Sequence, residues 1–99
     1  MEVTVAVVYM TYPVYEGKEA AFEKAYAAIH AVMQSAAGHK ESHLFRRISK
    51  PGEFLIVSEW DDQSAFDRFV NSEPFRAGTA DWGKDKIVSG QPTHHFVAG

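Results

Sequence analysis

Residues 54–75, FLIVSEWDDQSAFDRFVNSEPF, constrain the fold of this chain more than any other stretch. An alternating apolar segment ends in Trp60, two aspartates follow, and apolar side chains then recur at helical spacing. Because aspartate is a preferred N-cap residue, Asp61 or Asp62 is expected to begin a helix directly after a strand. A large aromatic residue at such a junction is well placed to form the wall of a pocket. Trp60 is therefore the first candidate for contact with a ligand.

Two strands and a helix are predicted before this stretch. Residues 3–12 are rich in β-branched and aromatic side chains, which predicts a strand covered on both faces. Residues 18–37 carry apolar side chains at helical spacing, and Gly38 is expected to end that helix. Residues 39–48 predict a second strand, which pairs across a Pro-Gly turn with the strand that ends in Trp60.

The remaining segments complete a familiar order of elements. Ser72 is expected to cap a third helix that Gly83 ends, and residues 93–97 predict a last short strand. The order β-α-β-β-α(α)-β predicts one α+β domain over residues 1–99. The expected arrangement is ferredoxin-like, a split β-α-β fold with a four-stranded antiparallel sheet and helices on one face.

The face of this sheet without helices is also expected to be apolar. It would carry Val3, Val5, Val7, Tyr9, Leu55 and Val57. A monomer would then expose a larger apolar patch than soluble proteins usually tolerate. We therefore expect a homodimer in which the two sheets pack face to face.

Composition excludes several classes of function. The chain has no cysteine, so disulfides, thiolate metal sites and cysteine nucleophiles are excluded. A net charge of −3 provides no basic surface for nucleic acid or for an anionic membrane. No apolar segment is long enough to span a bilayer, and the first twelve residues lack a basic leader, so a cytoplasmic protein is expected. His94 and His95 would point to opposite faces of a strand, and no metal site is expected.

Polar side chains on the second strand offer two interpretations. His43 and Arg47 share one face of this predicted strand, and Glu59 on the neighbouring strand is their expected partner. An ion pair in the dimer interface is the favoured interpretation. In the alternative, His43 is a general base or a polar anchor for a substrate, because histidine titrates near neutral pH.

A pattern spread over most of the chain joins these elements. It consists of Gly38, Leu44-Phe45-Arg46, the strand Phe54–Trp60, Trp60-x-x-x-x-Ala65-Phe66-x-x-Phe69 and Ser72-x-x-Phe75. This pattern resembles the antibiotic biosynthesis monooxygenase family, which belongs to a superfamily of dimeric α+β barrels. The superfamily also includes the haem-degrading monooxygenases of the staphylococcal type.

The resemblance implies two chemistries. Haem-degrading members use a tryptophan at the end of this strand, an asparagine on the first strand and an axial histidine after the Ser-x-x-Phe segment. The tryptophan is present as Trp60, whereas the asparagine position falls on Met10 and the axial position on Thr79. Neither Met10 nor Thr79 can replace a neutral imidazole as the ligand of the haem iron in that reaction. The resemblance therefore favours the cofactor-free members, in which the protein supplies a dry cavity and the substrate itself activates oxygen.

The implied function is cofactor-independent oxidation of a small aromatic or quinol-like molecule. The cavity would be lined by Trp60, Phe66, Thr79, Trp82 and Met10. His43 or Tyr12 would assist removal of a proton. Two alternatives stay open: a haem-binding or haem-degrading protein with an axial histidine at another position, and a dimer that binds a small ligand without catalysis.

Overall fold

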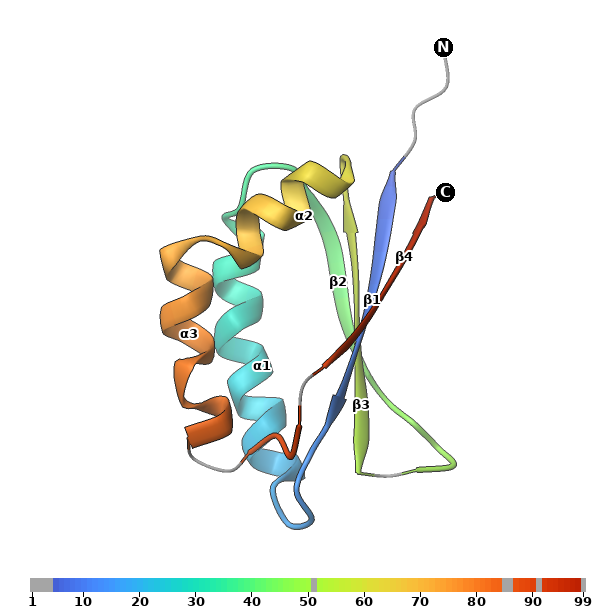
Figure 1. Ribbon diagram of the computed structural model, residues 1–99, viewed down its shortest axis with the longest axis vertical. Helices are drawn as coiled ribbons and strands as arrows, with labels where there is room; N and C mark the ends of the chain where they lie inside the picture. Colours follow the sequence, from blue (N-terminus) through green and yellow to red (C-terminus); the bar gives the residue numbers. More distant parts are fainter. Residues whose placement is uncertain (1–4, 51, 85–86, 91, 99) are drawn as a thin grey trace.

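One antiparallel sheet positions the candidate residues. The computed structural model describes residues 5–50, 52–84, 87–90 and 92–98, and its elements are β1 (Ala6–Pro13), α1 (Glu19–Gln34), β2 (His39–Arg46), β3 (Glu53–Trp60), α2 (Gln63–Val70), α3 (Glu73–Lys84) and β4 (Thr93–Ala98). The strands lie in the order β2-β3-β1-β4, and each neighbouring pair is antiparallel. All three helices cover the same face of the sheet (Figure 1). The predicted α+β ferredoxin-like fold is confirmed.

The register of β1 and β3 decides which side chains face the helices. Ala6 lies opposite Trp60, and Tyr12 lies opposite Phe54. Side chains alternate along a strand, so the even-numbered residues of both strands share the helix-covered face. The burial pattern agrees, because Val8 and Ile56 are fully buried whereas their sequence neighbours are not.

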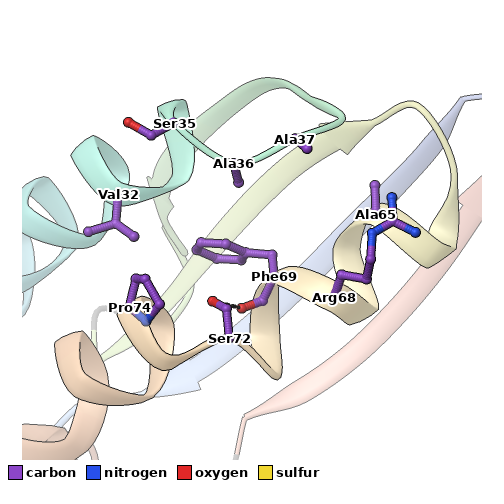
Figure 2. A pocket seen from close by; sticks show the side chains of 9 residues that line it. All are labelled: Val32, Ser35, Ala36, Ala37, Ala65, Arg68, Phe69, Ser72 and Pro74. Carbon is purple, nitrogen blue, oxygen red and sulfur yellow. Dashed lines mark hydrogen bonds between the residues drawn. The ribbon is translucent and has the colours of Figure 1, made fainter.

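The turn after α1 lies closely over α2. The helix ends at Gln34, three residues before the predicted end, and Gly38 is therefore not the residue that ends it. Gly38 instead has a φ of +86° within the turn, and a Cβ built on it would lie 2.5 Å from the Cβ of Ala65. Only glycine meets both conditions. The turn that carries Ala36 and Ala37 therefore faces Ala65 of α2 across a short distance (Figure 2).

Two side-chain caps begin the helices that follow β3. Oδ1 of Asp62 accepts a hydrogen bond from the backbone N–H of Ala65 at 2.8 Å, which confirms the predicted cap of α2. Oγ of Ser72 accepts from the N–H of Phe75 at 3.4 Å, as expected for the start of α3. That helix continues past Gly83 to Lys84, so the prediction that Gly83 ends it is wrong.

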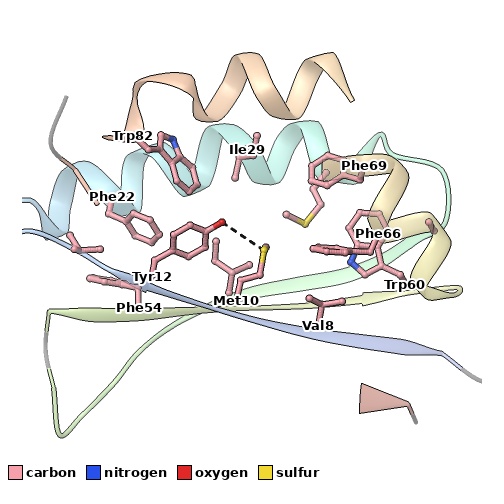
Figure 3. Packing of buried hydrophobic residues seen from close by; sticks show 14 residues of the cluster. Val8, Met10, Tyr12, Phe22, Ile29, Phe54, Trp60, Phe66, Phe69 and Trp82 are labelled. Carbon is pink, nitrogen blue, oxygen red and sulfur yellow. Dashed lines mark hydrogen bonds between the residues drawn. The ribbon is translucent and has the colours of Figure 1, made fainter. Parts of the chain in front are cut away.

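The core fills the space between the sheet and the helices. Aromatic side chains dominate it, and the buried cluster includes Val8, Met10, Tyr12, Phe22, Ile29, Phe54, Trp60, Phe66, Phe69 and Trp82 (Figure 3). Burial of large aromatic side chains is the main stabilising contribution available to a chain of this size.

The other face of the sheet is apolar and uncovered. Val7, Tyr9, Leu55 and Val57 are partly exposed there, as predicted, whereas Val3 lies outside the described residues. Phe45 and Val97 extend this face toward the edge strands, and about half of each side chain is exposed. Within the described part of the chain, no helix combines the length and the apolar character that crossing a membrane requires.

Candidate functional site

A cavity of about 450 Å³ lies between the end of β1, α3 and the segment that leads to β4. Its lining consists of Tyr12, Phe75, Thr79, Trp82, Val88, Ser89, Gly90 and Pro92. The volume is within the range of small-molecule sites, and aromatic walls with a few hydroxyl groups are typical of them. Three of the residues predicted from the sequence, Tyr12, Thr79 and Trp82, meet here.

Backbone hydrogen bonds hold the outer wall of this cavity. The N–H of Ser89 donates to the carbonyl oxygen of Pro13 at 2.8 Å, and Val88 forms an isolated antiparallel bridge with Val14. The N–H of Ile87 donates to the carbonyl oxygen of Trp82 at 2.8 Å, which turns the chain back from α3. Two of these three contacts join backbone groups that lie more than seventy residues apart in sequence.

Tyr12 and Trp82 form the inner wall. Their ring centroids lie 5.4 Å apart in an edge-on arrangement, and Phe22 packs against Trp82 at 5.3 Å. Edge-on contacts of this kind stabilise aromatic clusters beyond the area that they bury. Only 4% of Tyr12 and 5% of Trp82 remain exposed, so this wall is rigid and nearly dry.

Burial fixes the protonation state of Tyr12. Loss of hydration raises the pKa of its phenol from 10.0 to about 12, because the charged form is disfavoured away from water. The phenol hydroxyl donates a weak hydrogen bond to the sulfur of Met10 at 3.7 Å. At neutral pH, Tyr12 is therefore protonated and can donate a hydrogen bond.

Thr79 presents a hydroxyl group to the same cavity. Its Oγ1 donates to the carbonyl oxygen of Phe75, one turn earlier, at 2.9 Å. The hydroxyl proton is thereby occupied, and the oxygen keeps lone pairs that can accept a hydrogen bond. Oγ1 of Thr79 can thus accept a hydrogen bond from a hydroxyl group of a ligand, such as a phenol.

Trp60, Phe66 and Met10 lie deeper in the core and do not line this cavity. Trp60 is completely buried, and its indole N–H donates to Oγ of Ser58 at 2.9 Å. Its ring packs against Phe69 at 5.3 Å and edge-on against Phe66 at 5.8 Å. In this structure these three residues support the core behind the cavity.

His43 lies on the opposite face of the sheet from Tyr12. It pairs with Val57 of β3 on the uncovered face, and its side chain is exposed. The sheet therefore separates His43 from Tyr12 within a protomer.

The expected pairing with Glu59 is also wrong. Nε2 of His43 lies 3.7 Å from Glu41, and Nη1 of Arg47 lies 2.6 Å from Glu53. The hairpin explains the difference, since the N–H of Arg47 donates to the carbonyl oxygen of Glu53 at 3.0 Å and brings the two residues together.

The side chains of Thr79 and Met10 do not match the groups that the resemblance implies for holding haem. The hydroxyl at Thr79 donates within its own helix, and Met10 is buried with its sulfur facing Tyr12. Neither offers the imidazole that the iron requires. Among the described residues, no group of three or more histidine, aspartate or glutamate side chains is placed to hold a metal ion.

Several residues of the cavity were missed by the sequence predictions. Phe75 had a usable signal, because it precedes Thr79 by one helical turn and shares its face. Val88, Ser89 and Gly90 had none, since a loop reveals its partner only through tertiary contacts.

Comparisons with known proteins identify the family. The family model for antibiotic biosynthesis monooxygenases matches residues 5–81. A comparison with curated proteins found no match.

Solved structures share the fold at low sequence identity. A candidate antibiotic biosynthesis monooxygenase from Nitrosomonas europaea superposes with a TM-score of 0.87 at 11% identity, covering 100% of this chain and 93% of that one. Another from Caulobacter crescentus CB15 gives 0.82 at 22% identity, covering 94% and 87%. A conserved protein from Methanosarcina mazei Go1 gives 0.84 at 13% identity, covering 96% and 92%. With the family model over three quarters of its length and this fold throughout, the chain belongs to the antibiotic biosynthesis monooxygenase family.

Proposed function

We propose that this protein is a monooxygenase that oxidises a small aromatic or quinol-like molecule in the cavity beside Tyr12 and Trp82, without a bound cofactor. The observation that carries the proposal is the cavity itself. It combines buried aromatic walls with the hydroxyl groups of Thr79 and Ser89, in a chain that belongs to a monooxygenase family.

The chemistry requires no external reductant when the substrate supplies every electron. An activated methylene group of an aromatic substrate can take one oxygen atom of O₂ and become a carbonyl, while its two hydrogens leave with the other oxygen atom as water. The protein then has to bind the ring, exclude water and place hydrogen bonds.

The roles of the cavity residues follow from their hydrogen-bonding states. Trp82 and Phe75 would hold the substrate ring by edge-on or stacked contact. Oγ1 of Thr79 would accept a hydrogen bond from a substrate hydroxyl, because its own proton is already donated to Phe75. The protonated Tyr12 would exchange its weak hydrogen bond to the sulfur of Met10 for one to an oxygen that gains negative charge during the reaction.

Oxygen uptake with a panel of anthrones and quinols tests this proposal. Thr79→Val keeps the shape of the side chain and removes the acceptor oxygen, so turnover should fall by about tenfold or more. Thr93→Val, on the uncovered face of the sheet, is the matched control and should retain full activity. If no compound in the panel is consumed but one binds in the cavity, the protein is a ligand-binding dimer instead.

Haem titration tests the remaining alternative. A stoichiometric Soret band that a single histidine substitution abolishes would replace this proposal with haem binding through a residue outside the family position. We expect no such band.

We also propose that two copies associate through the uncovered face of the sheet. Val7, Tyr9, Leu55 and Val57 form an apolar strip along the two central strands of this face. Covering such a strip is the usual reason for a closed two-fold interface. Sedimentation should give twice the chain mass at micromolar concentration, and Val57→Asp should give a folded monomer. A wild-type monomer would contradict the proposal.

A further inference from the structure

The helical layer contains a second hollow, separate from the candidate active site. It has a volume of about 510 Å³ and lies between the end of α1, the middle of α2 and the start of α3. Its lining consists of Val32, Ser35, Ala36, Ala37, Ala65, Arg68, Phe69, Ser72 and Pro74 (Figure 2). We call this hollow the helical groove. It shares no lining residue with the cavity at Tyr12 and Trp82.

Small side chains keep the groove open. Ala36 and Ala37 lie on one side, Ala65 lies on the other, and the close approach of Gly38 to Ala65 fixes the distance between the two elements. Phe69 forms the floor, and its ring is locked by contacts with Trp60 at 5.3 Å and Phe75 at 5.1 Å. A rigid floor and walls of fixed spacing make a preformed site, which reduces the entropic cost of binding.

One cation stands beside this apolar surface. Arg68 lines the groove from α2 and is exposed, and none of the residues that the structure describes forms an ion pair or hydrogen bond with its side chain. The hydroxyl of Ser72 is different, because it donates to the carbonyl oxygen of Phe69. Ser35 adds a second exposed polar group on the opposite side of the groove.

We propose that the helical groove binds an amphipathic carboxylate, with its apolar body against Phe69 and its anionic head on the guanidinium of Arg68. The geometry satisfies both halves of such a ligand. The alanine walls and Phe69 accept an aliphatic chain or an aromatic ring. The planar guanidinium can donate two parallel hydrogen bonds to a carboxylate, and this pairing is shorter and stronger than a neutral hydrogen bond.

The position of Trp60 provides a direct readout. Its ring contacts the floor residue Phe69, and the chain contains only one other tryptophan, Trp82. In a Trp82→Phe variant, Trp60 is the single tryptophan, and its fluorescence reports on the core beneath Phe69. Octanoate serves as the anionic probe and octan-1-ol as its uncharged match.

The proposal is tested by titrating the full-length protein with octanoate and with octan-1-ol. The wild type is compared with two arginine variants. Octanoate should bind more tightly than octan-1-ol, and Arg68→Gln should weaken octanoate by about tenfold or more while leaving octan-1-ol unchanged. Arg76→Gln is the matched control, since Arg76 is an exposed arginine on the adjoining helix that does not line the groove. Amide resonances of Ala36, Ala65 and Phe69 should shift with octanoate.

Three results would overturn the proposal. The first is equal affinity for octanoate in the wild type and in Arg68→Gln. The second is a set of shifted resonances centred on Tyr12, Thr79 and Trp82, which would place octanoate in the other cavity. The third is a response of the groove resonances to protein concentration and not to octanoate, which would make a second copy of the chain the occupant. None of these measurements depends on oxygenase activity, so the proposal stands or fails separately from the proposed function.

Discussion

The indole N–H of Trp60 donates to Oγ of Ser58 across 2.9 Å, and both side chains are fully buried. The two residues alternate along β3 on its helix-covered face. This bond allows a tryptophan to be completely buried, since its one donor group is satisfied there. Trp60 is thereby defined first as a core residue.

Removal of this acceptor should destabilise the fold. Ser58→Ala leaves the indole N–H buried without a partner, so the free energy of unfolding should fall by about 1–3 kcal/mol. Urea unfolding at neutral pH measures the difference. Ser42→Ala is the control, because Ser42 pairs with the partly exposed hydroxyl of Tyr26 at 3.2 Å, and water can replace that bond. An equal loss in both variants would show that Trp60 does not depend on Ser58.

Substitutions at two glycines distinguish the cost of a positive φ from the cost of a steric clash. Gly38 and Gly17 have nearly the same positive φ, +86° and +85°, but only Gly38 would place a Cβ against another atom. Gly17→Ala should cost about 1 kcal/mol, the usual penalty of a left-handed backbone. Gly38→Ala should cost more, because the Cβ of Ala65 lies in the way. Equal losses in thermal or urea unfolding would show that the turn yields freely.

Tyr12 should make the protein sensitive to alkali. Its folded pKa of about 12 lies above the unfolded value of 10.0, so its contribution is complete below pH 10 and is lost as the pH rises toward 12. Two pKa units correspond to about 3 kcal/mol of unfolding free energy. Tyr12→Phe should remove this loss, as measured by urea unfolding at pH 9 and pH 11.5. Tyr15→Phe, at an exposed tyrosine, should retain it.

His39 should make the protein sensitive to acid. Burial lowers its pKa, a nearby charge on His30 lowers it further, and a backbone hydrogen bond at Glu41 opposes both effects. Among the described residues, no group bonds its buried Nε2 atom. Because the folded pKa is below the unfolded one, stability is complete above about pH 6.5 and falls as the pH drops through the folded value.

His39→Leu should flatten this acid dependence. The variant removes the titrating group, so the difference in unfolding free energy between pH 7.5 and pH 5 should shrink relative to the wild type. His95→Gln, at an exposed position on β4, is the control and should leave the difference unchanged. A wild-type slope in His39→Leu would assign the acid sensitivity to other groups.

The fold was predictable because its signals are local and repeated. Alternation along residues 54–60 and the cap at Asp62 gave β3 and α2 with little error. The uncovered apolar face was predictable from the same alternation. The end of α1 was not predictable, because Gly38 is needed for the close approach to Ala65 and does not end the helix.

The site was predictable only in part. Tyr12, Thr79 and Trp82 line one cavity, since the strand and the helix that carry them were placed correctly. His43 had two interpretations, the dimer interface or the cavity, and its alternation with Ser42 on β2 could not decide between them. The missing information was which face of β2 the helices cover, and this depends on packing of α1 against the strand. Pairing of Val14 with Val88 is a long-range contact that no local pattern contains.

The outer wall of the cavity can tolerate amino-acid substitutions. Residues 87–89 form backbone hydrogen bonds with Pro13, Tyr15 and Trp82, and these bonds do not depend on side-chain identity. Ser89 can therefore be exchanged for a larger, smaller or charged residue without rewriting the sheet or the aromatic wall. Under the proposed function, substrate choice and structural integrity would be separable traits, and libraries confined to this segment would test for altered specificity.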